Sequence, residues 1–123
     1  QAQCVPFVDD MAALYANVDV LICRAGAMTV SELAAVGVGS IMVPFPSAVD
    51  DHQTANARLL TEANAGTLLP QTELTPERLA DMLRALTREQ LLQQASNARS
   101  VAKPNATYDV AKICVQTAVY VRS

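Results

Sequence analysis

Residues 19–37 read Asp19-Val-Leu-Ile-Cys-Arg-Ala-Gly-Ala-Met-Thr-Val-Ser-Glu-Leu-Ala-Ala-Val-Gly37, and this stretch decides the fold class. It predicts an apolar strand over Val20–Cys23, a turn of small residues at 24–27, and a helix that ends at Gly37. A strand that turns through glycine directly into a helix points backbone N–H groups and the positive end of the helix dipole at one place, which favours a bound anion such as phosphate. An ordinary strand–helix unit, in which Gly26 only makes the turn, explains the same residues.

Short strands and helices alternate on both sides of this unit. Further strands are predicted at Ser40–Val43 and Gly66–Leu69, and further helices at Met11–Ala16, Gln53–Asn64, Thr75–Leu86, Thr87–Val101 and from Asn105 or Thr107 onward. The segment Val5–Val8 contains Pro6 and is predicted to be a strand end or the approach to a turn. This alternation predicts an α/β domain with a parallel sheet, flanking helices and a cluster of helices at the end.

Length and composition place limits on both organisation and function. The 123 residues fit one domain or part of a larger one, and because the chain opens on Gln1 with a strand-like segment, we expect a piece of a longer protein. Hydrophobic residues make up 51% of the chain, whereas aromatic residues make up only 4% and Trp is absent. With a net charge of −3 as well, the chain is not expected to bind nucleic acid.

The three cysteines, Cys4, Cys23 and Cys114, are an odd number without CxxC spacing. They predict reduced thiols in a cytosolic protein and no zinc site. No apolar run approaches the ~18 residues of a membrane-spanning helix, and no signal peptide is recognisable.

Polar and proline-rich connections follow the predicted strands, at 7–9, 24–29 and 44–53, whereas the returning turns are short. In an open parallel sheet, ligands bind outside the carboxyl ends of the strands. We therefore expect a ligand site where these three connections meet.

The spacing of Thr29 and Glu32 allows two interpretations. Thr29-Val-Ser-Glu32 fits a capping box, in which Glu32 bonds back to the start of its own helix. If instead the helix begins near Ala27, Glu32 lies one turn further in, where it could accept hydrogen bonds from a ribose diol. The sequence leaves both open, because helix starts are uncertain by a residue or two.

His52 is the only histidine, and it comes just before Gln53 at a helix start. No Ser/His/Asp set or second metal ligand accompanies it, so a polar loop role or contact with sugar hydroxyls is favoured over catalysis. Asp50 and Asp51 could hold a divalent cation, but capping of the helix or simple solvation is the stronger interpretation.

Several motifs in this order resemble the C-terminal domain of the MurG family, bacterial transferases of glycosyltransferase family 28. They are Phe7-Val-Asp-Asp-Met-Ala, Cys23-Arg-Ala-Gly-Ala-Met-Thr-Val-Ser-Glu-Leu-Ala, Val43-Pro-Phe-Pro, Asp50-Asp-His-Gln-Thr-Ala-Asn-Ala57, Ala98-Arg-Ser and Pro104-Asn-Ala-Thr107. Each motif alone is weak, and the match depends on their order and spacing. The resemblance implies the GT-B architecture, in which two Rossmann-like domains face each other across a cleft and the C-terminal one binds the nucleotide sugar.

The resemblance also implies a role for individual residues. Phe7 and the backbone of Val8 would contact the uracil, and Gly26, Ala27, Met28 and Thr29 would contact the diphosphate. Glu32 would bind the ribose. His52 and Gln53 would contact the N-acetylglucosamine (GlcNAc), and Asn56 would support the loop. Two positions depart from the family, because Ala25 stands where some members have Ser and His52 where some have Gln. No metal, cofactor or catalytic residue is expected in this chain.

The resemblance implies an inverting transfer of GlcNAc from UDP-GlcNAc to undecaprenyl-diphospho-muramoyl-pentapeptide, at the cytoplasmic face of the bacterial inner membrane. The N-terminal domain, which binds the lipid-linked acceptor and supplies the base, and the first strand and glycine-rich loop of the C-terminal domain would precede residue 1. The alternatives are another GT-B transferase, of a glycolipid or dolichol pathway, and a non-catalytic nucleotide-sugar-binding module.

Overall fold

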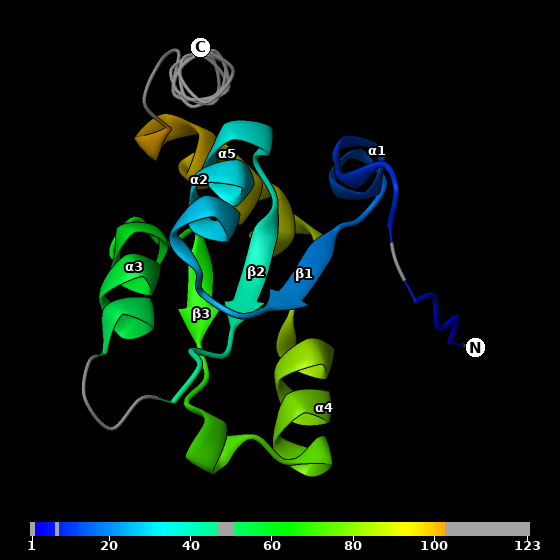
Figure 1. The fold of residues 1–123 in the computed structure, drawn as a ribbon, viewed down its shortest axis with the longest axis vertical. Coiled ribbons are helices and arrows are strands. Elements are labelled where there is room, and N and C mark those ends of the chain that lie inside the picture. The colour runs from blue at the N-terminus through cyan, green and yellow to red at the C-terminus, as the bar shows by residue number, and fades with distance from the viewer. Residues whose placement is uncertain (1, 7, 47–50, 103–123) are drawn as a thin grey trace, which may run out of the picture.

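The computed structural model describes residues 2–6, 8–46 and 51–102, which form three strands and the helices around them (Figure 1). The elements in chain order are α1 (Met11–Ala16), β1 (Val20–Cys23), α2 (Ala27–Val36), β2 (Gly39–Met42), α3 (His52–Thr61), β3 (Gly66–Leu68), the 3₁₀ helix η1 (Gln71–Glu73), α4 (Pro76–Ala85) and α5 (Arg88–Val101). The predicted α/β class with a parallel sheet is confirmed.

The sheet has the order β1-β2-β3, and both pairs are parallel. Val20 pairs with Gly39 at one end of the β1–β2 ladder and Cys23 with Met42 at the other. The central strand, β2, is buried along its whole length, as its continuous apolar run predicts. All three strands point the same way, so their carboxyl ends share one edge, which lies at the bottom of the sheet in Figure 1.

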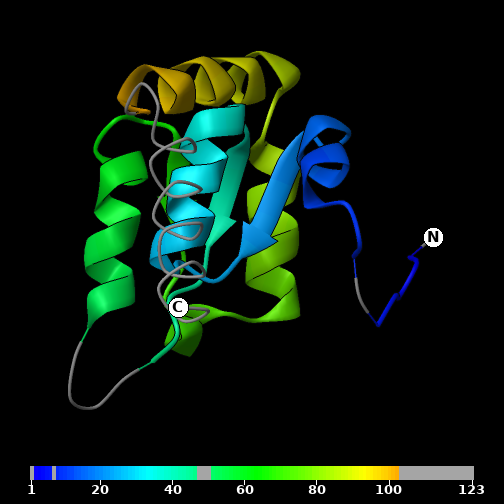
Figure 2. The ribbon, with the colours of Figure 1, turned by 45° about the horizontal axis from the view of Figure 1, so that its top comes forward.

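Helices cover both faces of the sheet (Figure 2). Successive side chains of a strand point to opposite faces, and β2 accordingly places Met42 in one apolar cluster and Ile41 in the other. The larger cluster joins the sheet to α2 and α3, and the smaller one joins it to α4. α5 packs at the opposite edge from the strands' carboxyl ends, where its Gln94 side chain lies against Gly39.

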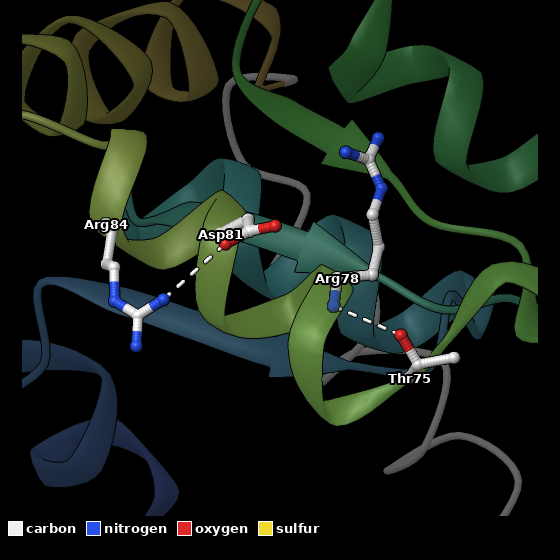
Figure 3. A network of polar contacts seen from close by, with 4 residues as sticks. All are labelled: Thr75, Arg78, Asp81 and Arg84. Atoms are coloured by element: carbon white, nitrogen blue, oxygen red, sulfur yellow. Dashed lines mark hydrogen bonds and ion pairs between the residues drawn. The ribbon is translucent and has the colours of Figure 1, made fainter.

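α4 starts where its sequence predicts. The Thr75 hydroxyl accepts a hydrogen bond from the Arg78 N–H at 3.1 Å, and Pro76 occupies the first turn (Figure 3). On its solvent side, Arg84 pairs with Asp81 at 3.5 Å, and both side chains are more than two-thirds exposed. Such a pair contributes little stability, so α4 is held mainly by the apolar side chains on its other side.

Some boundaries differ from the predictions. α3 runs over His52–Thr61, starting one residue earlier and ending three residues before the expected Asn64, which itself has a left-handed φ of 56°. On α4, Leu83 is 38% exposed, whereas Leu79, Met82 and Leu86 pack on the sheet. The segment Val5–Val8 holds no strand in its described part, and the predicted last helix lies outside the described residues. Among the described helices, none is both long and apolar enough to cross a membrane.

The α3–sheet contact can be tested with two neighbouring leucines. Leu60 is fully buried, and Leu60→Ala should lower the free energy of unfolding of the chain by about 2–5 kcal/mol through lost burial and a cavity. Leu59→Ala is the matched control, because Leu59 is 49% exposed and its truncation should cost under about 1 kcal/mol. Urea-induced unfolding measures both, and equal losses would contradict the placement of α3.

Candidate functional site

The first turn of α2 lies at the carboxyl edge of the sheet, directly after β1. Gly26 is the N-cap, with φ −62° and ψ 151°, and no side chain caps the helix. The first intrahelical bond runs from the Val30 N–H to the Gly26 carbonyl at 3.0 Å. In the part of the chain that the structure describes, the N–H groups of residues 27–29 therefore point out of the helix without a protein partner.

This helix start decides between the two interpretations of Thr29. The capping-box interpretation is wrong, because Thr29 lies inside the helix and Gly26 precedes it as the cap. The helix begins at Ala27, as the alternative requires, which places Glu32 one turn further in. Glu32 makes its hydrogen bond with another helix, as described below.

Two side chains at the start of α3 hold the turn in place. The Gln53 Oε1 atom accepts hydrogen bonds from the Ala25 N–H at 3.2 Å and from the Phe45 N–H at 2.7 Å. The Asn56 Nδ2 group donates to the Ala25 carbonyl at 3.1 Å. Ala25 itself is fully buried, so both of its backbone polar groups are satisfied by amide side chains. We call Gln53 and Asn56 the amide clamp.

The amide clamp limits what Gln53 can offer to a ligand. Its oxygen is shared by two backbone N–H groups, which also determines the orientation of the amide. A sugar hydroxyl near Gln53 would therefore be bound through the Nε2 donor. Asn56 faces the turn with its donor group, in keeping with a role in support.

Glu32 meets a residue that the sequence did not single out. The buried Tyr15 hydroxyl donates to Glu32 Oε2 at 2.7 Å. Burial, the hydrogen bond to Glu32 and the negative charge of Glu32 together raise the pKa of Tyr15 above its ordinary value, so the phenol remains a proton donor at neutral pH. The only feature of the sequence that could have pointed to Tyr15 is its place among small residues in a short predicted helix.

Arg24 is the second residue that the sequence analysis missed. Its Nη1 atom donates to Gln71 Oε1 at 2.6 Å and to the Val43 and Pro44 carbonyls at 3.4 Å each. Its guanidinium also lies 5.4 Å from the centre of the Phe45 ring. Arg24 thus joins the segments that follow all three strands. Its cationic side chain directly after β1 was the available signal.

The remaining predicted residues differ in how exposed they are. Met28 is 63% exposed beside the uncapped N–H groups, and His52 is exposed at the first position of α3. Val8 is half-buried ahead of α1, whereas Phe7 lies outside the described residues.

Asp51 is the N-cap of α3, and its carboxylate accepts a hydrogen bond from the Thr54 N–H at 3.4 Å. Its capping interpretation is therefore supported. Asp50 lies outside the described residues, and no cluster of metal-ligating side chains occurs among those that are described.

A hollow of about 390 Å³ opens at the same edge, between the segments after β2 and β3 and the start of α3. Its lining includes Phe45, Asp51 and Gln71. Another hollow, of about 490 Å³, lies between α4 and α5, away from the uncapped turn. We place the candidate site at the carboxyl edge because the free N–H groups are there, not because of cavity size.

The cysteine nearest the turn is Cys23, and its burial disfavours the thiolate form. Cys23 ends β1 and is half-buried, and burial raises the pKa of its thiol. A thiol of this kind behaves as a small apolar side chain. Cys4 is exposed, and Cys114 lies outside the described residues.

The amide clamp predicts a stability effect that depends on burial. Asn56→Asp keeps the side-chain shape but replaces the donor that faces the Ala25 carbonyl with an oxygen, so the free energy of unfolding should fall by about 1–3 kcal/mol. Asn97→Asp in α5 is the matched control, since it removes an equivalent exposed bond to the Asn64 carbonyl and should cost less. Urea unfolding compares the two, and an equal loss would mean that the clamp adds nothing.

Comparison with known proteins gives one consistent family. Residues 1–115 match the glycosyltransferase family 28 C-terminal domain. The chain is 61% identical over 117 residues to the UDP-N-acetylglucosamine--N-acetylmuramyl-(pentapeptide) pyrophosphoryl-undecaprenol N-acetylglucosamine transferase of Ralstonia nicotianae, covering 95% of this chain and 32% of that protein. The same-named protein of Dechloromonas aromatica is 59% identical over 118 residues, which is 96% of this chain and 33% of that protein.

A solved structure gives the same family. The crystal structure of Acinetobacter baumannii MurG matches with a TM-score of 0.81 and 46% identity, over 90% of this chain and 32% of that one. The chain thus spans about a third of the length of the curated relatives that it matches. By sequence and by fold, the chain belongs to the glycosyltransferase family 28 C-terminal domain family.

Proposed function

We propose that this chain is the donor-binding part of the C-terminal domain of a GT-B glycosyltransferase. The whole enzyme would move GlcNAc from UDP-GlcNAc to undecaprenyl-diphospho-muramoyl-pentapeptide. The observation that carries the proposal is the uncapped start of α2 at residues 26–29, held by the amide clamp at the carboxyl edge of a parallel sheet. The names of the similar transferases support the choice of donor and acceptor.

The diphosphate would lie against the first turn of α2. Three N–H groups and the positive end of the helix dipole offer an anion site there, and the Thr29 hydroxyl lies in the same turn. The space beside Gly26 is open, because a side-chain Cβ at this position would meet only Thr29 Oγ1, at 3.9 Å. The exposed Met28 would flank the same ligand.

The other donor contacts follow from the resemblance and are adjusted by the geometry. Glu32 would bind the ribose hydroxyls through the oxygen that Tyr15 does not occupy. His52 and the Nε2 group of Gln53 would contact the GlcNAc, and Asn56 would keep the turn in place. Phe7 and the Val8 backbone would meet the uracil.

The reaction would be an inverting substitution at the anomeric carbon. A hydroxyl of the acceptor sugar attacks this carbon, the bond to the UDP oxygen breaks, and UDP leaves with the electron pair. The proton of the attacking hydroxyl passes to a base on the N-terminal domain. The contribution of this chain is to stabilise the negative charge that grows on the leaving diphosphate, which preorganised N–H groups do effectively in a site that excludes water.

The proposal extends to the parts of the enzyme that would complete the site. β1 pairs only with β2 among the described strands, so its other edge could pair with a further strand. A glycine-rich loop after that strand would complete the diphosphate site, and the N-terminal domain would bind the lipid-linked acceptor. The enzyme would act as a peripheral protein at the cytoplasmic face of the bacterial inner membrane.

A proline at the first position of α2 tests the anion site. Ala27→Pro removes one N–H without opposing the helix, because proline is favoured at this position and the extended ψ of 151° at Gly26 is compatible with a following proline. We define the hybrid transferase as the Ralstonia nicotianae relative with this chain in place of its matching third. In it, Ala27→Pro should lower kcat/KM for UDP-GlcNAc about 10–100-fold, the effect of one lost charge-assisted hydrogen bond.

Ala27→Val is the matched control, since it adds similar bulk at an exposed position and keeps the N–H. Because Ala27→Val keeps the N–H, it should lower kcat/KM much less than Ala27→Pro does. Equal losses in the two variants, with unchanged unfolding midpoints, would refute diphosphate binding at this turn. If the hybrid binds UDP-GlcNAc without transferring GlcNAc, the transferase assignment is wrong.

A further inference from the structure

The hydrogen bond between Tyr15 and Glu32 joins two helices at the candidate ribose subsite. We propose that Tyr15 is a positioning residue, which orients the Glu32 carboxylate for the ribose hydroxyls of the nucleotide. The proposal rests on the proposed function, because it assumes that Glu32 meets the ribose. Tyr15 itself would not touch the donor.

Tyr15 is anchored well enough to set the direction of a neighbour. It is 4% exposed, and it is the buried residue of α1, whose other side chains are exposed or half-buried. Its ring belongs to the larger apolar cluster, together with Leu33 and Ala34 of α2. Packing therefore holds the Tyr15 ring in place, and this fixes the position of its hydroxyl.

The bond reaches only one of the two carboxylate oxygens. The distance of 2.7 Å from the Tyr15 oxygen to Glu32 Oε2 is typical of a strong hydrogen bond to a charged acceptor. No group of the described residues donates to Oε1, which could accept from a ribose hydroxyl. A glutamate without such a partner would lose side-chain rotamer freedom when it bound the ribose, and fixing it beforehand lowers that cost.

The same bond links two parts of the donor site along the chain. α1 begins two residues after Asp9, so Tyr15 lies in the helix that directly follows the Val8 segment, where the uracil is expected. Glu32 lies in the helix whose start would hold the diphosphate. The bond therefore ties the helix that follows the Val8 segment to the helix that carries Glu32.

Tyr15→Phe in the hybrid transferase separates the hydroxyl from the ring. The KM for UDP-GlcNAc should rise about five- to tenfold, the effect of one hydrogen bond, while kcat stays close to the parent value. With a donor whose ribose lacks both hydroxyls, Tyr15→Phe and the parent should have the same KM. A purely structural role would not distinguish the two donors.

Asn17→Ala is the control for a loosened α1. It removes the 2.7 Å bond from Asn17 Nδ2 to the Ala13 carbonyl at the far end of α1 and leaves Tyr15 in place, so both KM values should match the parent. A KM rise of equal size for both donors in Tyr15→Phe, with a lower unfolding midpoint, would overturn the proposal and leave Tyr15 a structural role.

The Glu32→Ala variant distinguishes a failure of this inference from a failure of the proposed function. If Glu32→Ala raises the KM for UDP-GlcNAc but Tyr15→Phe does not, the positioning role is wrong and the ribose contact stands. If Glu32→Ala changes neither KM nor kcat, the ribose contact is wrong and the positioning role fails with it.

Discussion

The fixed position of the turn between β1 and α2 is the constraint on which the rest of the site depends. The turn is buried at Ala25, and a buried peptide group without hydrogen-bond partners is costly. Both polar groups of Ala25 are satisfied by the amide clamp, whose Gln53 and Asn56 lie 28 and 31 residues later in the chain. The start of α2 is thereby held against α3, and no group of the described residues accepts a hydrogen bond from the N–H groups of residues 27–29.

Segments after all three strands contribute to this arrangement. The Arg24 guanidinium contacts carbonyls after β2 and a side-chain oxygen after β3, and Gln53 also binds the Phe45 N–H. Polar contacts of this kind keep a loop-built site in one geometry, which electrostatic stabilisation of a leaving group requires. The parallel sheet brings the carboxyl ends of its strands to one edge, and the side-chain hydrogen bonds of Arg24 and Gln53 hold the segments there together.

Much of the fold could be predicted because its signals are local. The apolar run of β2 and the Thr75 cap and Pro76 of α4 each act within a few residues, and the structure shows both of them. The end of α3 was predicted too late, since Asn64 reads as a helix residue but adopts a left-handed φ. Only the structure shows that Asn64 adopts this conformation, in the turn that leads to β3.

The candidate site was harder to predict because its contacts are distant in sequence. Thr29 and Glu32 have the spacing of a capping box, yet the glycine before Ala27 starts the helix and Tyr15, 17 residues upstream, takes the carboxylate. The amide clamp was likewise invisible, since it joins residues about 30 positions apart. The family resemblance named the turn before α2 and the start of α3, which the structure joins by hydrogen bonds, but it did not describe those bonds.

The most direct test of the account is a crystal structure of the hybrid transferase with UDP bound. The account predicts diphosphate oxygens about 2.7–3.2 Å from the N–H groups of residues 27–29, and ribose hydroxyls within the same range of the Glu32 oxygen that Tyr15 leaves open. A diphosphate bound away from the first turn of α2, or a Glu32 that makes no contact with the ribose, would contradict it.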